Sequence, residues 1–178
     1  LMDQDAAQVP VGSNRLLYLP YLMGERTPHL DPDCRGVFFG LSAIHTRQDM
    51  LRAVMEGVTH SLRDCYDILL EMDVHPEQMM ACGGGGTSAL WRQMLADLYG
   101  CQVATVSSKE GPALGVAILA GVRTGLFPSV EGACRKFIGT DRVCPPIPEH
   151  TRQYARYHEV YRGLYPALKD SFRQLQEL

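Results

Sequence analysis

The sequence predicts an α/β domain, and three observations support that class. Short apolar runs that end at glycine or proline predict buried strands. Longer segments between those runs repeat apolar residues at helical spacing, which predicts amphipathic helices. From residue 78 onward the predicted order is strand, helix, strand, helix, which is typical of neighbouring parallel strands. An average sheet has about five or six strands, and fewer are predicted in these 178 residues. We therefore expect further strands upstream.

The first half of the chain is predicted to hold two short strands and one long helix. Residues 3–8 form the end of a helix, and residues 16–19 and 37–39 form strands that a long polar loop separates. Thr46 opens the long helix, with Asp49 three residues later as its capping-box partner. An apolar stripe at spacings of three and four residues predicts one core-facing side. The stripe consists of Leu51, Val54, Val58, Leu62, Cys65 and Leu69.

Two further strands are predicted over residues 78–82 and 102–106. Between them lie a tight loop of glycines at residues 83–86 and a helix of about eleven residues. Ser88 suits the N-cap of that helix, since its hydroxyl can accept a backbone N–H of the first turn. Gly100 suits the residue after its last turn, because glycine adopts the left-handed conformation without steric cost.

The last third of the chain is predicted to contain two helices and a loop-rich stretch. Pro112 follows Gly111 at the first turn of one helix, and Gly125 ends it. Residues 126–150 are expected to be mostly loop, and an amphipathic helix covers about residues 151–176. Basic residues gather on this helix, but acidic and apolar residues interleave with them. We therefore expect a solvated helix face there.

Composition excludes several functional classes. The hydrophobic fraction is 46%, the charged fraction 21% and the net charge -3, without a basic stripe, so nucleic acid is not an expected partner. The longest apolar runs are too short to span a membrane, and the N-terminal residues lack a signal-peptide pattern. The six cysteines form no C-x-x-C pair, and the six histidines are dispersed. We therefore expect reduced thiols, no metal site and a cytoplasmic protein.

The segment Cys82-Gly83-Gly84-Gly85-Gly86-Thr87-Ser88 is the most informative local feature. Consecutive glycines are costly in backbone entropy, so they are typical of a backbone that must turn sharply or approach a ligand closely. The segment joins a strand to a helix N-terminus, where free backbone N–H groups and the helix dipole favour an anion such as phosphate. The alternative is a flexible turn without a ligand.

Two other nucleotide motifs fit this segment less well. A P-loop requires lysine before serine or threonine after the glycines, and no lysine follows here. Gly84, Gly86 and Ala89 do fit the pattern G-x-G-x-x-A of dinucleotide sites, but that pattern also needs an acidic residue at the end of the next strand. The residues at that point are Val106 and Ser107. Dinucleotide binding therefore stays a minor alternative.

Two other segments are ambiguous. Residues 111–121 are rich in glycine and alanine, which indicates either tight helix packing or one wall of a pocket beside the glycine segment. Residues 24–32 are dense in charged residues and proline, and they form either a substrate-facing loop or a solvated loop braced by its prolines. No catalytic triad or metal site can be assembled from residues 24–32, so we assign them no catalytic role.

Several of these stretches together resemble the FGGY family of carbohydrate kinases. Residues 19–29, with Gly24-Glu25-Arg26-Thr27-Pro28-His29, are similar to the branch that phosphorylates D-xylulose. The second family signature is matched from Gly36-Val37-Phe38-Phe39-Gly40-Leu41 through Asp49 to Glu56. The glycine segment with Leu90-Trp91-Arg92-Gln93 is similar to the family's nucleotide loop, and residues 110–120 are similar to the helix after the next strand.

The resemblance implies an actin-like, ribonuclease-H-like fold of two α/β domains that bind ATP and Mg²⁺ in the cleft between them. Residues 1–178 then form an incomplete C-terminal domain. Gly84 and Gly85 match positions that approach the phosphates and ribose, and Ser88 matches a position that contacts the adenosine. The catalytic aspartate is expected in the missing N-terminal domain, so this chain holds no catalytic residue. Many relatives have Ala and Arg where this chain has Gly86 and Thr87.

The expected reaction is ATP-dependent phosphorylation of a ketose such as D-xylulose to D-xylulose 5-phosphate, with this chain inactive on its own. The alternatives are a kinase for gluconate, ribulose or glycerol, and a non-catalytic nucleotide-binding module. The expected partners are ATP, a sugar and the missing N-terminal domain of the same polypeptide. We also expect an exposed apolar edge near residues 16–19, through which two copies could pair as a homodimer.

Overall fold

The computed structural model describes residues 2–106 and 111–178. The N-terminal half contains α1 (Met2–Ala7), the 3₁₀ helix η1 (Ser13–Arg15), β1 (Leu17–Leu19), β2 (Val37–Phe39) and α2 (Arg47–Glu71). Next come β3 (Gln78–Ala81), α3 (Gly83–Thr87), α4 (Ala89–Tyr99) and β4 (Gln102–Val106). The remainder contains α5 (Gly111–Arg123), α6 (Val130–Phe137), β5 (Thr140–Cys144) and α7 (Pro148–Gln176). None of the described helices combines the length and apolar character needed to cross a membrane.

The strands form two small sheets. β1 and β2 pair antiparallel, with Tyr18 opposite Phe38. The other sheet has the order β3-β4-β5, and its β3–β4 pair is parallel, as the strand–helix–strand order predicts. β5 pairs antiparallel with β4 and lies in the stretch that we expected to be loop, as does α6. The side chains of β5 are mostly exposed, so its sequence has no apolar run that would signal a strand.

The long helix α2 begins as predicted but buries a different face. Thr46 and Asp49 form the full capping box. The predicted apolar stripe, however, is partly uncovered, with Val54 36% and Leu62 42% exposed. The helix instead buries a polar row at spacings of three and four, which consists of Asp49, Arg52, Glu56, His60 and Asp64. The desolvation cost of burying such a row is offset because its members have hydrogen-bond partners or neighbouring charges.

Glu56 is the centre of a buried polar network. Its carboxylate accepts hydrogen bonds from the Gly12 backbone N–H at 3.0 Å and the Ser13 hydroxyl at 2.7 Å. It also accepts from Arg52 Nε and the Tyr154 hydroxyl, each at 2.8 Å. Arg52 Nη1 in turn donates to two backbone carbonyl oxygens, those of Ala6 in α1 and of Val9 just after it. One carboxylate therefore joins η1, α2 and α7, which gives the last residue of the second family signature a structural role.

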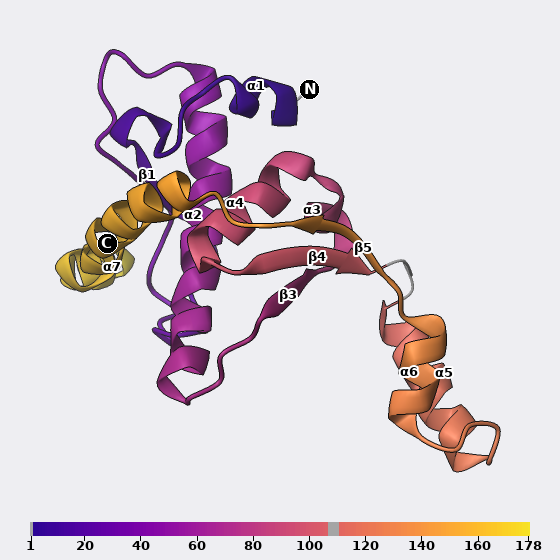
Figure 1. Cartoon of the computed structure of the whole chain (residues 1–178). Coiled ribbons are helices and arrows are strands. Elements are labelled where there is room, and N and C mark those ends of the chain that lie inside the picture. Colours follow the sequence, from indigo (N-terminus) through magenta and orange to yellow (C-terminus); the bar gives the residue numbers. More distant parts are fainter. Residues whose placement is uncertain (1, 107–110) are drawn as a thin grey trace.

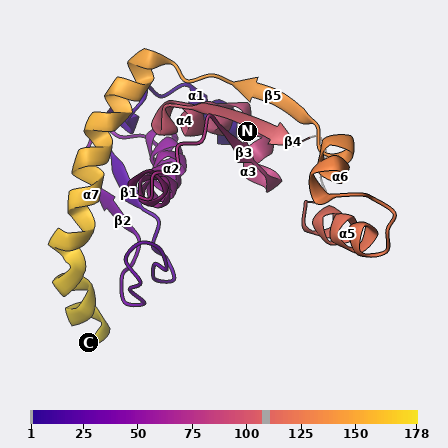
Figure 2. The same ribbon diagram turned by 60° about the horizontal axis from the view of Figure 1, so that its bottom comes forward.

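The main apolar core lies between β1 and α7, so the expectation of an exposed edge at residues 16–19 is wrong. Leu16 and Leu19 are fully buried, and Leu17 is 5% exposed. Leu17 and Leu19 share a cluster with Tyr161, Leu164, Tyr165 and Phe172 from α7, which crosses the molecule beside β1 (Figure 2). The basic residues of α7 lie on its exposed side, as predicted.

Helices α5 and α6 lie beside each other at one end of the molecule, away from α2 and α7 (Figures 1 and 2). Of the described residues in α5, only Ile118 and Gly121 are buried. Val116 and Leu119 are 68% and 59% exposed although they are apolar. The described part of the chain therefore leaves much of this helix uncovered.

Candidate functional site

The glycine segment lies between β3 and α4, as predicted, but it is not a tight loop. Residues 83–87 form the short helix α3, which follows directly on an extended Cys82. Gly83 has a φ of +70°, a conformation that residues with a side chain rarely adopt. Ser88 then separates α3 from α4 in an extended conformation, and its Oγ accepts the Trp91 backbone N–H at 3.1 Å. Ser88 is thus the predicted N-cap of α4.

The glycines of this segment differ in what surrounds them. A β-carbon at Gly84 would have no atom within 4 Å, whereas one at Gly86 would lie 2.6 Å from the Ala81 carbonyl oxygen. A β-carbon at Gly85 would lie 2.6 Å from the Trp91 ring. Internal packing therefore explains why Gly85 and Gly86 lack a side chain. It does not explain Gly84, whose open side faces away from the protein.

Arg92 places a positive charge behind the glycine segment, and sequence reasoning gave it no role. Its Nη1 donates to the Gly86 carbonyl oxygen at 2.6 Å, although the residue is only 5% exposed. Its Nε is buried without a hydrogen-bond partner among the described residues. The signal in the sequence is the spacing of four from Ser88, which puts Arg92 on the side of α4 nearest the segment.

A hollow of about 310 Å³ adjoins the segment. Apolar side chains of β3 and α4 line it, together with Leu62 of α2 and the backbone of Gly85 and Gly86. Of the described residues, none from α5 contributes to its lining, so the structure does not support a pocket wall formed by residues 111–121. Tight packing does explain Gly121, where a β-carbon would lie 2.6 Å from Phe127.

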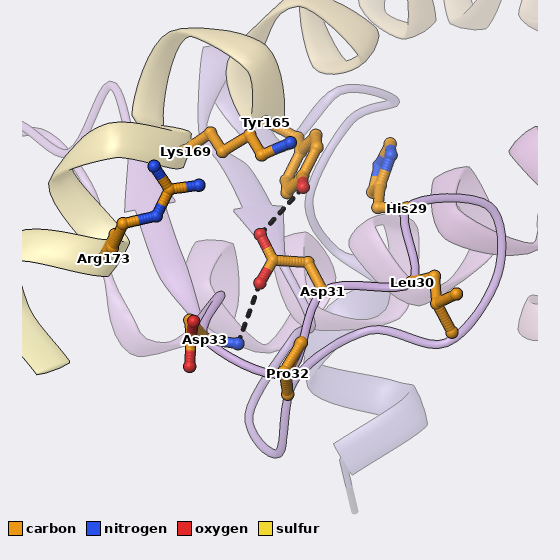
Figure 3. Close-up of a pocket in the computed structure, with 8 residues that line it drawn as sticks. All are labelled: His29, Leu30, Asp31, Pro32, Asp33, Tyr165, Lys169 and Arg173. Carbon is orange, nitrogen blue, oxygen red and sulfur yellow. Dashed lines mark hydrogen bonds between the residues drawn. The ribbon is translucent and has the colours of Figure 1, made fainter.

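The polar loop over residues 24–32 is braced by its own hydrogen bonds and by α7 (Figure 3). The Glu25 carboxylate accepts the backbone N–H groups of Thr27 and His29 at 2.7 and 2.8 Å. The Tyr165 hydroxyl donates to Asp31 Oδ2 at 2.8 Å, and the His29 ring stacks on Tyr165 at 3.7 Å between centroids. Hydrogen bonds from the Asp33 backbone and Tyr165 lower the pKa of Asp31.

A small polar pocket of about 250 Å³ opens between this loop and α7. Figure 3 shows Asp31 and Asp33 on one side, with Lys169 and Arg173 reaching over from the helix. Charges of both signs line the pocket, and Tyr165 already occupies one oxygen of Asp31. These contacts hold the loop against α7.

A buried cluster of titratable groups lies between α2 and α7. His158 Nε2 is 3.2 Å from Asp67 Oδ2 and 3.4 Å from Asp64 Oδ1. On its other side, His158 Nδ1 is 3.2 Å from Nδ1 of His60. Burial raises the pKa of Asp64 to about 7, and burial together with the neighbouring His158 lowers that of His60 to about 3. The dispersal of histidines along the sequence gives no sign of this cluster.

Comparison with known proteins places these features in a family context. The model of the FGGY family of carbohydrate kinases, C-terminal domain, matches residues 1–124. A xylulose kinase of Staphylococcus epidermidis is 40% identical over 164 residues, and the xylulose kinase of Escherichia coli is 43% identical over 173 residues. A gluconokinase of Bacillus subtilis is 35% identical over 178 residues.

These alignments cover 92%, 92% and 99% of the chain, but only 33%, 34% and 34% of the three relatives. The chain therefore spans about a third of the length of the curated relatives that it matches. Among solved structures, the ligand-bound xylulose kinase from Lactobacillus acidophilus superposes with a TM-score of 0.92 at 30% identity. That superposition covers 98% of this chain and 35% of the other.

Proposed function

Because the chain belongs to the FGGY family of carbohydrate kinases, we propose that its glycine segment binds ATP as part of an ATP-dependent sugar kinase. The proposed reaction transfers the γ-phosphoryl group to D-xylulose and yields D-xylulose 5-phosphate. Within that enzyme, residues 1–178 are an incomplete C-terminal domain that supplies part of the nucleotide site. The enzyme is cytoplasmic in this proposal.

The open side of Gly84 is the observation that carries this proposal. A backbone can approach phosphate oxygens closely only where no side chain intervenes, and a β-carbon at Gly84 would meet no described atom within 4 Å outside its own helix backbone and chain neighbours. The first N–H groups of α3 have no partner within the helix, so they can donate to an anion. Arg92 adds a positive charge behind them. Most of the catalysis in phosphoryl transfer comes from such positioning and charge stabilisation.

The other proposed contacts have more restricted geometry. The side of Gly85 that would carry a side chain faces Trp91, so Gly85 can contact the ribose or phosphates only through its backbone. Ser88 Oγ accepts the Trp91 N–H, which leaves its hydroxyl hydrogen free to donate to the adenosine. Mg²⁺, when bound with ATP, would neutralise charge on the phosphates, and we assign it no ligand in this chain.

The rest of the proposed active site belongs to other parts of the enzyme. The catalytic aspartate and most sugar contacts are expected in an N-terminal domain of the same polypeptide, consistent with relatives about three times as long. The comparisons include a gluconokinase that is 35% identical as well as xylulose kinases. Gluconate, ribulose and glycerol are therefore the alternative substrates, and a non-catalytic nucleotide-binding module is the alternative function.

Nucleotide binding can be tested on the chain itself. ATP should shift the amide NMR signals of Gly84 to Ser88 more than those of α7. Gly84→Val should abolish these shifts, because a β-branched side chain fills the space that the phosphates need. Gly163→Val is the matched control, since Gly163 also has open space around it but lies on α7. Equal ATP affinity in Gly84→Val and the unaltered chain would refute the assignment. A thermal shift with NAD that exceeds the shift with ATP would favour the dinucleotide alternative.

The reaction itself needs the remainder of an enzyme. Grafting this chain in place of the corresponding third of the Escherichia coli xylulose kinase should give a chimera that releases ADP when D-xylulose is added. Gly84→Val in the chimera should remove that activity, and parallel assays with gluconate, ribulose and glycerol identify the preferred sugar. A chimera that folds and binds ATP without phosphorylating any of the four would support the non-catalytic alternative.

A further inference from the structure

Three side chains of the metal-binding type converge in the interface between α2 and α7. Asp64 and Asp67 are three residues apart and so project from one face of α2, and His158 projects towards them from α7. One ligand atom from each of the three lies within 4.8 Å of the others. In the described part of the chain, no other group of three or more His, Cys, Asp or Glu side chains meets this criterion. The cluster is separate from the glycine segment.

The distances from His158 to the two carboxylates suit a common metal ion. Donors that each lie about 2.0–2.2 Å from one ion are roughly 3.0–3.5 Å from each other in tetrahedral or octahedral geometry. The distances from His158 Nε2 are 3.4 Å to Asp64 Oδ1 and 3.2 Å to Asp67 Oδ2. One imidazole nitrogen and two carboxylate oxygens form a donor set that Zn²⁺ accepts, with a fourth position left for water.

Asp64 provides a second and independent indication. Its side chain is only 6% exposed, yet its nearest charged partners are His158 Nε2 at 3.4 Å and Arg162 Nε at 4.0 Å. Both contacts are longer than an ordinary charge-assisted hydrogen bond. A cation between Asp64 and His158 would lie closer to this largely buried carboxylate than either side chain does. Arg162 is 58% exposed and can turn into solvent when an ion enters.

The neighbours of the cluster orient its ligand atoms. Arg63 Nε donates to Asp67 Oδ1 at 2.6 Å, which leaves Oδ2 of Asp67 directed at His158. The fully buried His60 stacks on His158 with 7° between the ring planes, and the two Nδ1 atoms are 3.2 Å apart. When His158 donates its Nδ1–H to His60, the lone pair of Nε2 points at the two carboxylates. Metal-bound histidines are commonly held by a hydrogen bond of this kind.

We propose that Asp64, Asp67 and His158 bind a divalent transition-metal ion, with Zn²⁺ as the best match, and that this ion joins α7 to α2. The site is structural, and it does not depend on the nucleotide assignment. The alternative is that the cluster binds no metal and is held by the hydrogen bond between His158 Nε2 and Asp67 Oδ2.

Metal titration of the chelator-treated chain tests this proposal. Isothermal titration with ZnCl₂ should show one ion bound per chain with these ligands. His158→Gln and Asp64→Asn should each weaken binding at least tenfold, since even the loss of a supporting residue typically costs about 10–100-fold in metal affinity. His150→Gln is the matched control, because His150 pairs with Asp97 at 2.9 Å but has no third ligand nearby. It should retain the affinity of the unaltered chain.

Two further measurements keep the test decisive if a variant misfolds. Zn²⁺ should shift the imidazole NMR signals of His158 in the unaltered chain and leave those of His150 in place. Co²⁺ should bind without the intense near-ultraviolet band of a thiolate ligand, because the six free cysteines are not part of the cluster. The proposal is overturned if the His158 signals do not move, if His158→Gln binds Zn²⁺ as tightly as the unaltered chain, or if cobalt shows thiolate ligation.

Discussion

Trp91 lies against the one side of Gly85 from which a side chain would project. A β-carbon there would be 2.6 Å from Cζ3 of the indole, and the indole Nε1–H donates to Thr59 Oγ1 at 2.8 Å. Because that hydrogen bond fixes the ring to α2, the ring cannot easily move aside. The glycine segment is thus held against the long helix by a contact that requires glycine for structural reasons.

Alanine substitutions should separate structural from ligand-related glycines. Gly85→Ala should lower the free energy of unfolding by about 1–3 kcal/mol, as is usual for overpacked sites. Gly84→Ala should keep stability or raise it by up to about 1 kcal/mol, because alanine favours helix over glycine and the position is open. Urea unfolding measures both values. Equal effects of the two substitutions would show that Trp91 does not constrain the segment.

Loss of the Glu56 carboxylate should be severe. Glu56→Gln leaves Arg52 buried without a counter-charge, and breaking a buried ion pair in this way typically costs about 3–5 kcal/mol. Glu71→Gln is the control on the same helix, because Glu71 is exposed and has no such partners. Chemical unfolding of both variants tests this expectation, which fails if the two lose similar amounts of stability.

The capping box should give a pH-dependent contribution to stability. Hydrogen bonds from Thr46 and Asn14 lower the pKa of Asp49, so the folded state holds its proton less tightly than the unfolded chain does. The resulting stabilisation is present above the unfolded pKa of about 3.9 and is lost as the pH falls through the folded value.

Asp49→Asn should therefore be about 1–2 kcal/mol less stable than the unaltered chain at pH 7. The difference should shrink below about pH 4, where the unaltered chain also loses the charge at this position. Thermal unfolding across this range checks the trend, with the exposed Asp170→Asn as the reference. A difference that stays constant with pH would exclude the ionised carboxylate as its source.

Self-association, if it occurs, should involve β3 rather than residues 16–19. β3 pairs only with β4 among the described residues, and the 41% exposed Met80 lines one hollow with Leu62. Met80→Glu should reduce association in sedimentation velocity experiments, because a charge on an open edge opposes strand pairing. Leu175→Glu, at an equally apolar exposed position of α7, should have little effect. A larger loss of association in Leu175→Glu than in Met80→Glu would show that β3 is not the contact surface.

Local signals in the sequence predicted local structure well. The capping box at Thr46, the N-cap at Ser88 and the left-handed Gly100 were all predicted, because each depends on residues a few positions apart. The parallel β3–β4 pair followed from the element order. The position of the glycine segment was predicted for the same reason, although its helical conformation was not.

Features that depend on distant residues could not be predicted. The sequence shows two possible faces on α2, and the buried one is decided by Gly12, Ser13 and Tyr154, which lie 44, 43 and 98 residues from Glu56. β5 has too few apolar residues to be recognised and is defined by its pairing with β4. The Asp64–Asp67–His158 cluster depends in the same way on the crossing of α2 and α7.

The position of α7 has a consequence for how the chain can be divided. The family match ends at residue 124, but Tyr154, Tyr161 and Phe172 of α7 belong to the buried interior. A recombinant fragment cut at residue 124 would lose the hydroxyl that Tyr154 donates to Glu56, and it would expose Leu17 and Leu19 to water. Such a fragment would retain every residue that the family model matches, yet it should aggregate rather than fold. The boundary of the family model is therefore not a boundary at which this core can be cut.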